Sequence, residues 1–217
     1  MTAPGLFITF EGIDGAGKST QIDRLRNKLE SEGKRVVLTR EPGGTPVGEK
    51  IRTLLLSDDM TPRTETLLFF AGRAEHAETK IRPALETGAW VLSDRFTDAT
   101  YAYQVGGKGF PGEEVEALER WTLGDFHPSG TVLFDLDPEI AAQRRAKRAD
   151  GAPADRFEAE STRFFTKVRE AYLSRARRDP ERFLIVDALA SVDVIAAQIA
   201  EWVDALEARQ TSIRKGA

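Results

Sequence analysis

The segment GIDGAGKST, residues 12–20, constrains the fold of this chain more than any other. An apolar, strand-like run ends just before it at Phe10, and a helical pattern with Ile22, Leu25 and Leu29 on one stripe follows it. The segment matches G-x-x-x-x-G-K-[ST], in which glycines let successive backbone N–H groups point into one concavity at a helix N-terminus. A glycine-rich turn without a ligand is the alternative, which the flanking strand and helix disfavour. The pattern therefore predicts a site for a nucleoside triphosphate.

Two side chains of this loop have expected tasks in such a site. Lys18 would reach the β- and γ-phosphates, and Ser19 would place its hydroxyl group on Mg²⁺. A kinase, an ATPase or a GTPase would all carry these two residues, so the loop alone does not choose among them.

Strand-like apolar runs alternate with helical patterns along the rest of the chain. Strands are expected at 6–10, 35–39, 89–93, 130–136 and 182–186, and helices near 47–56, 64–87, 113–122, 138–148, 158–178 and 191–209. Strands without strict alternation, separated by helices, indicate an α/β fold with a five-stranded parallel sheet and helices on both faces. We expect one domain over residues 1–209 and a flexible C-terminal tail over 210–217.

The composition indicates an ordinary globular protein and excludes several classes of site. Of the 217 residues, 41% are hydrophobic and 30% are charged, and there is no cysteine, so thiolate metal sites and disulfides are excluded. The net charge of -4 argues against a general nucleic-acid partner, and no apolar run is long enough to predict a membrane span. With no signal-peptide pattern at the N-terminus, a cytoplasmic enzyme is expected. His76 and His127 are expected at the surface or as capping residues.

Charged residues follow two of the expected strands, at the sheet edge where ligands of such folds bind. Asp94 would serve as a ligand of a Mg²⁺-bound water or as a general base, and Arg95 would grip phosphate oxygens. An Asp–Arg pair that caps the following turn is the alternative. Glu41 lies in the loop over residues 39–46, which brings a charged pair and two glycines to the same edge. A plain connecting loop is equally compatible with that segment.

Two further segments are candidates for ligand contacts. Phe69 and Arg73 lie one helical turn apart, so the ring could stack on a nucleotide base while the guanidinium group donates hydrogen bonds to it. The alternative is that Phe69 is part of the core, as an aromatic residue in an apolar run more often is. The segment 144–157 is rich in cations and, around 148–155, in residues that break helices. A mobile lid whose cations neutralise a transferring phosphoryl group is one interpretation, and a solvated charged face is the other.

Taken together, these segments resemble one family, the bacterial thymidylate kinases (dTMP kinases). The matching segments, in the family's order and spacing, are residues 10–20, 39–45, 51–56, 68–73, 94–104, 123–126, 135–139 and 155–158. The resemblance implies a three-layer P-loop NTPase fold with a mobile lid over about 144–157. It also implies transfer of a phosphoryl group from ATP to dTMP, giving dTDP for dTTP biosynthesis, with Mg²⁺, in a homodimer and without a nucleic-acid or membrane partner.

Residue roles are implied position by position. Asp14 resembles the carboxylate that meets the sugar 3′-hydroxyl group, Phe69 the aromatic ring that stacks on thymine, and Arg73 the donor to a thymine carbonyl group. The residues implied to bind dTMP are Asp14, Glu41, Arg52, Phe69, Arg73, Arg95, Thr100, Tyr103 and Gln104. Those implied to bind ATP are Gly12, Gly15, Ala16, Gly17, Lys18, Ser19 and Thr20, with Ser19 and Asp94 at the metal. The implied catalytic set is Lys18, Asp94, Arg95, Arg148 and Arg156.

Gly15 stands where some thymidylate kinases carry a catalytic arginine. The resemblance then implies that the lid supplies this cation. Arg148 and Arg156 are the first candidates, and Arg144 and Lys147 are the next. The chain departs from the family pattern at Lys108 and Phe110, where arginine and isoleucine are more usual, and in extra small residues at 151–154.

The sequence also leaves alternative functions open. Another nucleoside-monophosphate or deoxynucleoside kinase of the same fold is the main alternative, although purine kinases need a larger pocket than the one Phe69, Arg73 and Gln104 suggest. A GTPase switch would need an Asn-Lys-x-Asp motif, which the chain lacks. A nucleotide-binding scaffold without catalysis is disfavoured by Lys18, Asp94 and the lid arginines.

Overall fold

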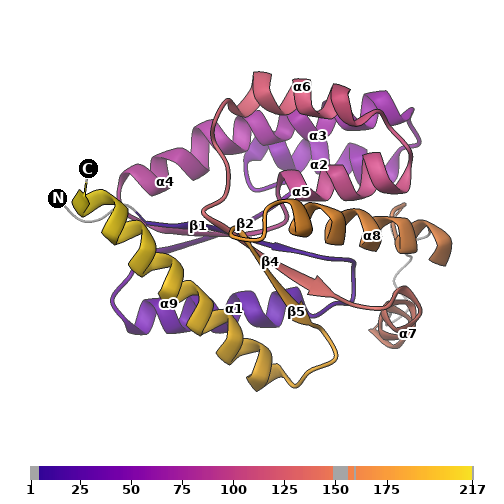
Figure 1. The fold of residues 1–217 in the computed structure, drawn as a ribbon. Coiled ribbons are helices and arrows are strands. Elements are labelled where there is room, and N and C mark those ends of the chain that lie inside the picture. Colours follow the sequence, from indigo (N-terminus) through magenta and orange to yellow (C-terminus); the bar gives the residue numbers. More distant parts are fainter. Residues whose placement is uncertain (1–4, 149–155, 159, 217) are drawn as a thin grey trace.

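A single parallel sheet organises the protein. The computed structural model describes residues 5–148, 156–158 and 160–216. The sheet has the strand order β2-β3-β1-β4-β5 (Figure 1). Its strands are β1 (Phe7–Glu11), β2 (Val36–Arg40), β3 (Trp90–Asp94), β4 (Gly130–Asp135) and β5 (Phe183–Asp187). All pairings are parallel, so the carboxyl ends of the strands meet at one edge. The predicted sheet is confirmed, and each strand begins and ends within one residue of its predicted ends.

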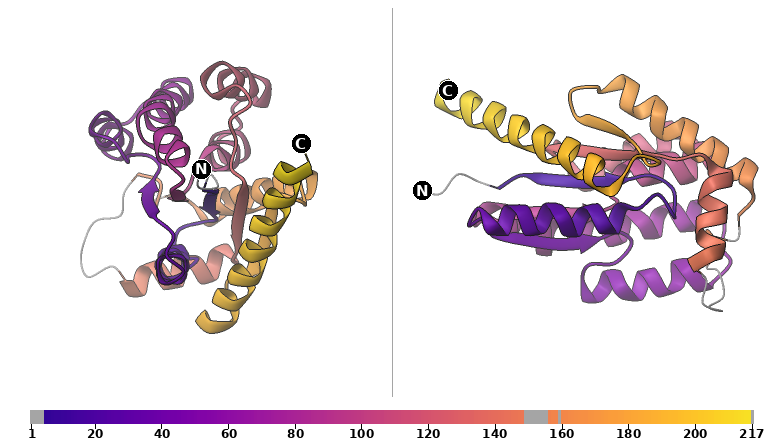
Figure 2. Two further views of the ribbon diagram at one scale, coloured as in Figure 1. Left: turned by 90° about the vertical axis from the view of Figure 1, so that its left-hand side faces the viewer. Right: turned by 90° about the horizontal axis from the view of Figure 1, so that it is seen from below.

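Helices cover both faces of this sheet. The α-helices are α1 (Lys18–Ser31), α2 (Pro46–Ser57), α3 (Pro62–His76), α4 (Arg82–Glu86), α5 (Thr97–Thr100), α6 (Gly112–Leu123), α7 (Pro138–Arg148), α8 (Thr162–Arg178) and α9 (Val192–Gly216). Two π-helical turns are η1 (Ala77–Ile81) and η2 (Tyr101–Gly107). Helices α1 and α9 lie together on one side of the sheet, and α4 and α8 lie on the other, as the two further views in Figure 2 also show.

Two helical segments differ from the prediction. No helix was predicted for the stretch α5–η2, but it is helical and packs on α8, where a Cβ atom on Gly106 would come within 2.4 Å of the Ala171 side chain. Packing against a distant helix therefore fixes this segment.

Helix α9 continues to Gly216, beyond the predicted end at residue 209. Polar residues do not end a helix by themselves, since glutamine, arginine and lysine are good helix formers.

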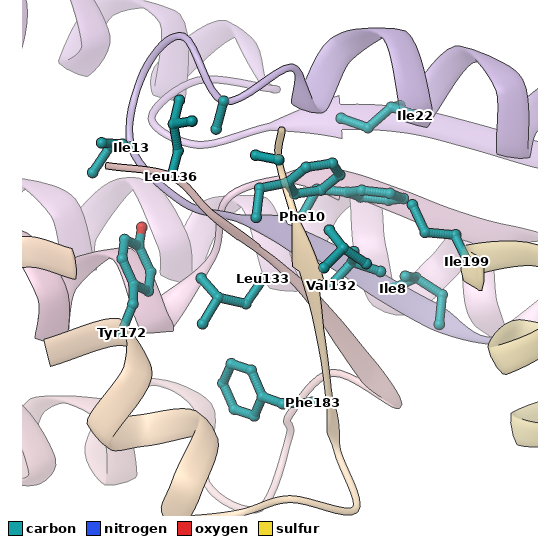
Figure 3. Packing of buried hydrophobic residues seen from close by; sticks show 14 of the residues in the cluster. Ile8, Phe10, Ile13, Ile22, Val132, Leu133, Leu136, Tyr172, Phe183 and Ile199 are labelled. Carbon is teal, nitrogen blue, oxygen red and sulfur yellow. The ribbon is translucent and has the colours of Figure 1, made fainter. Parts of the chain in front are cut away.

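The core lies on both faces of the two central strands. Ile8 and Phe10 of β1 and Val132 of β4 pack with Ile22 of α1 and Ile199 of α9 (Figure 3). A second cluster on the opposite face joins the sheet to η1 and α6. Each fully buried large apolar side chain contributes about 1.5–3 kcal/mol to folding. The packed sheet thus gives a rigid support to the loops that leave its carboxyl edge.

Candidate active site

The phosphate-binding loop connects β1 to α1, and two of its glycines are required by its shape. Gly12 has a φ of 131°, and a Cβ atom there would lie 2.7 Å from the carbonyl oxygen of Phe134 in the neighbouring strand. Gly17 has a φ of 91° at the N-cap of α1. A side chain at either position would meet backbone or adopt a conformation that L-residues avoid. The loop therefore lies tightly against the sheet edge with its concave side open at the start of α1.

Lys18 is held inside this loop. Its Nζ atom donates to the carbonyl oxygens of Gly12 and Ile13 at 3.3 and 3.4 Å, and it lies 3.9 Å from the carboxylates of both Asp14 and Asp94. Burial, and after it the positive charge of Arg95, lowers the pKa of Lys18. The amine is thus prepositioned at the centre of the loop, between the carboxylates of two different elements.

Asp94 and Ser19 both offer oxygen ligands beside Lys18. Asp94 ends β3, and its buried Oδ1 atom has no hydrogen-bond partner in the described part of the chain. Ser19 is exposed in the first turn of α1. A carboxylate oxygen and a hydroxyl group are donors that a hard cation such as Mg²⁺ prefers. No group of three or more histidine, cysteine, aspartate or glutamate side chains in the described residues could hold a metal by protein ligands alone. The arrangement fits a cation that also needs ligands from a substrate.

Arg95 adopts a left-handed backbone conformation directly after Asp94. Its φ of 74° is the one positive value among the non-glycine residues that the structure describes. Its NH2 atom donates to Asp14 at 2.9 Å and to the Tyr103 hydroxyl group at 3.0 Å, and its NH1 atom donates to the Tyr172 hydroxyl group at 3.0 Å. Burial opposes the charge of the guanidinium group, but Asp14 and the two tyrosines raise the pKa of Arg95 well above its ordinary value. A fixed cation therefore stands beside the loop.

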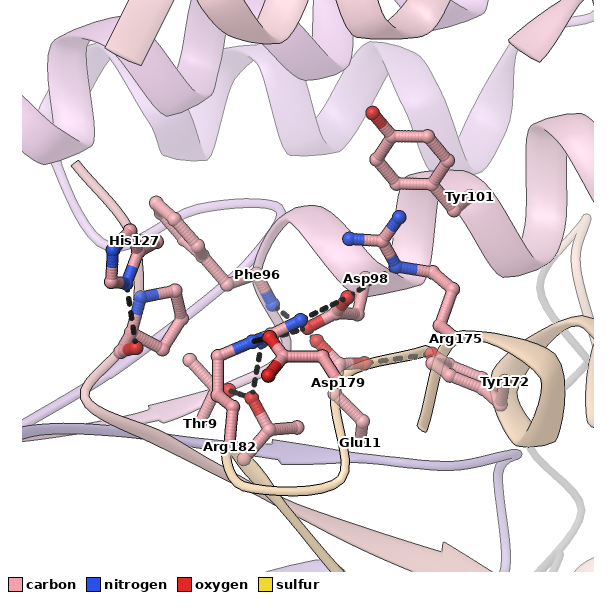
Figure 4. A network of polar contacts seen from close by, with 12 residues as sticks. Thr9, Glu11, Phe96, Asp98, Tyr101, His127, Tyr172, Arg175, Asp179 and Arg182 are labelled. Atoms are coloured by element: carbon pink, nitrogen blue, oxygen red, sulfur yellow. Dashed lines mark hydrogen bonds and ion pairs between the residues drawn. The ribbon is translucent and has the colours of Figure 1, made fainter. Parts of the chain in front are cut away.

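Glu11 supports Arg95 indirectly, through Phe96 and Tyr172 (Figure 4). Its Oε1 atom accepts the Phe96 N–H at 2.7 Å, and its Oε2 atom accepts the Tyr172 O–H at 2.7 Å. One carboxyl group thus holds both the peptide that follows Arg95 and the tyrosine that contacts its guanidinium group. Burial, and then the nearby charge of Asp98, raises the pKa of Glu11 to about 8. Such support is what a strained backbone conformation needs in order to persist.

Asp98 anchors the segment that follows Arg95. Its carboxylate is buried between Arg175 of α8 and Arg182, which donates to it at 2.7 Å (Figure 4). Burial works against this charge, but the two arginines outweigh it and lower the pKa of Asp98. The start of α5 is therefore tied to α8 and to the β5 edge of the sheet.

A cavity opens next to Arg95 at the sheet edge. It is lined by Asp14, Glu41, Pro42, Arg52, Leu56, Phe69, Arg73, Arg95, Phe96, Ala99, Tyr103, Gln104 and Phe157. All residues expected to bind dTMP line it except Thr100, which is buried and whose hydroxyl group has no partner in the described residues. Residues from six parts of the chain thus meet beside the phosphate-binding loop.

The far end of the cavity is organised by the buried carboxylate of Glu41. It accepts from Arg73 Nε at 2.8 Å and pairs with His76 Nδ1 at 2.9 Å, while His76 Nε2 contacts the Thr39 hydroxyl group at 2.6 Å. The prediction of His76 as a surface or capping residue was wrong: α3 carries it inward, its side chain makes no cap hydrogen bond, and both ring nitrogens find polar partners. Arg73 NH1 has no partner in the described residues, so this end of the cavity retains a donor.

Aromatic rings close the cavity beside that donor. Phe69 and Tyr103 each lie 6.1 Å from the Phe157 ring, measured between centroids. Arg52 donates to the Pro42 carbonyl oxygen at 2.8 Å on the opposite wall. An apolar slot with a few fixed polar groups is the usual form of a small-molecule site.

The predicted lid cations lie in different places. Arg144 donates to the carbonyl oxygens of Gly15 at 3.4 Å and Ala188 at 3.1 Å, so it lies at the phosphate-binding loop. Arg156 instead donates to Leu55 and to the buried carboxylate of Glu65. Lys147 is exposed on α7. The Arg148 side chain and residues 149–155 lie outside the described residues. Which of these residues supplies the catalytic cation stays a prediction.

Comparison with known proteins settles the family. The family model described as thymidylate kinase matches residues 10–199. The chain belongs to the thymidylate kinase family. It is 53% identical over 205 residues to the thymidylate kinase of Paraburkholderia xenovorans, covering 93% of this chain and 98% of that one. It is 52% identical over 208 residues to that of Burkholderia vietnamiensis, covering 94% and 100%. A crystal structure of thymidylate kinase from Ehrlichia chaffeensis superposes with a TM-score of 0.74 at 32% identity, covering 93% and 99%.

Within this thymidylate kinase fold, several site residues escaped the sequence analysis. Glu11 and Glu65 are buried carboxylates that hold the cavity-lining residues Phe96 and Gln104 through hydrogen bonds. Asp98 is a third, which ties the segment after Arg95 to Arg175 and Arg182. A charged residue inside an apolar run, as at the end of β1, was the signal that could have found Glu11. No helix in the described part of the chain combines the length and apolar character that crossing a bilayer requires.

Proposed function

We propose that this protein transfers the γ-phosphoryl group of ATP to dTMP, giving ADP and dTDP. The observation that carries the proposal is the cavity lined by Phe69, Arg73 and Gln104, directly beside the loop that holds Lys18. A nucleotide with its base in the cavity would have its own phosphate next to Arg95.

The phosphate end supports transfer by positioning and charge. Phosphoryl transfer between two anions needs cations and alignment more than covalent chemistry. Lys18 would contact the donor phosphates, and Arg95, held by Asp14 and two tyrosines, would orient the acceptor phosphate. Ser19 and Asp94 would hold Mg²⁺, which would neutralise charge on the phosphates when it is bound. Arg148 and Arg156 of the lid are the proposed additional catalytic cations.

The base end supports selection of a neutral pyrimidine. The Phe69 ring offers a stacking surface, and Arg73 NH1 offers a donor to a ring carbonyl group. A site whose buried polar groups are left unpaired by the wrong ligand discriminates strongly against it. Tyr103 and Asp14 would lie against the sugar.

We also propose that two copies form a homodimer in the cytoplasm, where both nucleotide substrates occur. The dimer is supported by exposed apolar side chains on neighbouring helices, namely Leu54 of α2, Leu67 of α3 and Trp121 of α6. Sedimentation velocity tests the assembly: a dimer is expected for the wild type and a monomer for Leu67→Glu. A wild-type monomer at micromolar concentration contradicts it.

A panel of nucleoside monophosphates tests the reaction. Each is supplied with ATP and Mg²⁺, and ADP release and the phosphorylated product are measured. We expect dTMP to give dTDP at a kcat/KM at least about tenfold above that of dGMP, because a purine needs a larger space beside Phe69 and Arg73 than a pyrimidine does. Equal turnover of dTMP and dGMP contradicts the assignment.

A further inference from the structure

A second buried carboxylate, Glu65, lies behind the cavity wall. It is fully buried in the first turn of α3 and does not itself line the cavity. Its Oε1 atom accepts from Gln104 Nε2 at 2.9 Å. Its Oε2 atom accepts from Lys108 Nζ at 2.6 Å and from Arg156 NH2. Donors from two separate segments, η2 with its C-cap residue and the segment that begins at residue 156, therefore converge on one carboxylate.

This contact fixes the polarity of the Gln104 side chain. A glutamine amide carries a donor and an acceptor of nearly equal shape, and either one can face a ligand. A carboxylate paired with Lys108 and Arg156 has only acceptor atoms, so the amide nitrogen of Gln104 must face it. Because Gln104 is 1% exposed and lines the cavity, its oxygen is the atom left for a ligand.

Arg73 supplies the opposite polarity on the same cavity. A guanidinium group can only donate, and NH1 of Arg73 has no partner in the described residues. A fixed donor and a fixed acceptor match a base edge that carries a carbonyl group beside a ring N–H, as in thymine and uracil. Cytosine presents an amino group and an unprotonated ring nitrogen at this edge. The Arg73 donor would then face another donor, and the Gln104 oxygen would face another acceptor.

We propose that Glu65 is a specificity-determining positioning residue, which makes the cavity select pyrimidines with an imide edge by locking the Gln104 amide. The proposal rests on the proposed function, since it takes a pyrimidine nucleotide as the ligand of this cavity. Lys108 and Arg156 both donate to the second oxygen of Glu65, so either cation alone keeps the carboxylate from turning toward the cavity.

The test is binding calorimetry of dTMP, dUMP and dCMP to the wild type, Glu65→Gln and Lys108→Gln. An amide at position 65 can pair with Gln104 in either orientation, so Gln104 gains the freedom to turn. We expect Glu65→Gln to reduce the dTMP-to-dCMP affinity ratio by about tenfold, because the wild-type site leaves buried polar groups of cytosine unpaired and the variant does not. The dTMP-to-dUMP ratio should stay at the wild-type value, because both bases carry the same imide edge. Lys108→Gln, which removes a cation from the same carboxylate but leaves the Gln104 contact, should keep both ratios.

A role in stability alone would lower all affinities together and leave the ratios unchanged, and that result overturns the proposal. Glu65→Asp is the second variant. It keeps the negative charge beside the two cations, but its shorter side chain no longer reaches Gln104. The same drop in the dTMP-to-dCMP affinity ratio is expected. Failure of the proposed function would be distinct: a wild type that binds dTMP selectively but forms no dTDP with ATP.

Discussion

The two ends of the cavity are built in different ways. At the phosphate end, the loop over residues 12–19 is one continuous segment, and its glycines and Lys18 take their positions from local backbone geometry. At the base end, Arg73 and Gln104 come from distant helices and are held by the buried carboxylates of Glu41 and Glu65. The phosphate end is therefore a local structure, whereas the base end depends on long-range ion pairs. Substitutions at the base end should alter selectivity while the phosphate end stays intact.

The largest effect is expected for Lys18→Ala. Removing this cation should lower kcat about 10²–10³-fold, as loss of one prepositioned charge at a transition state does. The affinity for dTMP, measured by calorimetry, should change by less than about threefold, since Lys18 contacts the loop and not the base end. A comparable loss of dTMP affinity would contradict the separation of the two ends.

Arg73→Ala should produce the opposite pattern. We expect the KM for dTMP to rise about 10²-fold, because the donor is lost and Glu41 is left with His76 alone. The KM for ATP should remain near the wild-type value. Arg63→Ala is the matched control on the same helix, since Arg63 is 70% exposed and pairs with Glu114 at the surface. If ATP affinity falls instead in Arg73→Ala, Arg73 has been assigned to the wrong nucleotide.

The lid arginines should act on turnover. Arg148→Ala and Arg156→Ala are each expected to lower kcat by about tenfold or more, with little change in nucleotide binding, if a lid cation stabilises the transferring group. Single-turnover kinetics with saturating ATP and dTMP measures this step. Arg177→Ala, an exposed arginine of α8, is the control. Wild-type turnover in both lid variants would mean that the cation comes from elsewhere, with Arg144 at the phosphate-binding loop as the next candidate.

The smallest effect concerns Glu11 and depends on pH. With a pKa raised to about 8 in the folded protein, Glu11 keeps a proton between pH ~4.5 and ~8 that the unfolded chain releases. Its contribution to stability therefore falls as the pH rises through this window. Glu11→Gln removes the titration and keeps an acceptor for the Phe96 N–H. Relative to the wild type, its free energy of unfolding should rise by about 1 kcal/mol or more from pH 5 to pH 8.

Urea denaturation at the two pH values measures this difference. Glu114→Gln, an exposed substitution of the same chemistry, reports the effect of removing one surface carboxyl group. Parallel pH dependence of Glu11→Gln and the wild type would show that burial does not hold a proton on Glu11.

The same contrast explains what the sequence could predict. The sheet, most helices and the phosphate-binding loop follow from local patterns, because strands and glycine turns depend on near neighbours in the chain. The burial of His76 could not be predicted, since it depends on Glu41, 35 residues away. Segment η2 is helical because it packs on α8, and no local periodicity encodes that contact. Arg73 was a candidate from its spacing to Phe69, and Gln104 was found through resemblance. Glu65, which contacts Gln104, is recognisable only once α3 and η2 are brought together.

A crystal structure of the protein with dTMP tests the assignment of the two ends most directly. We predict the thymine ring on Phe69, with a carbonyl oxygen at NH1 of Arg73, the ring N–H at the Gln104 oxygen and the phosphate beside Arg95. A nucleotide bound with its base at the phosphate-binding loop, or outside the cavity, would contradict it.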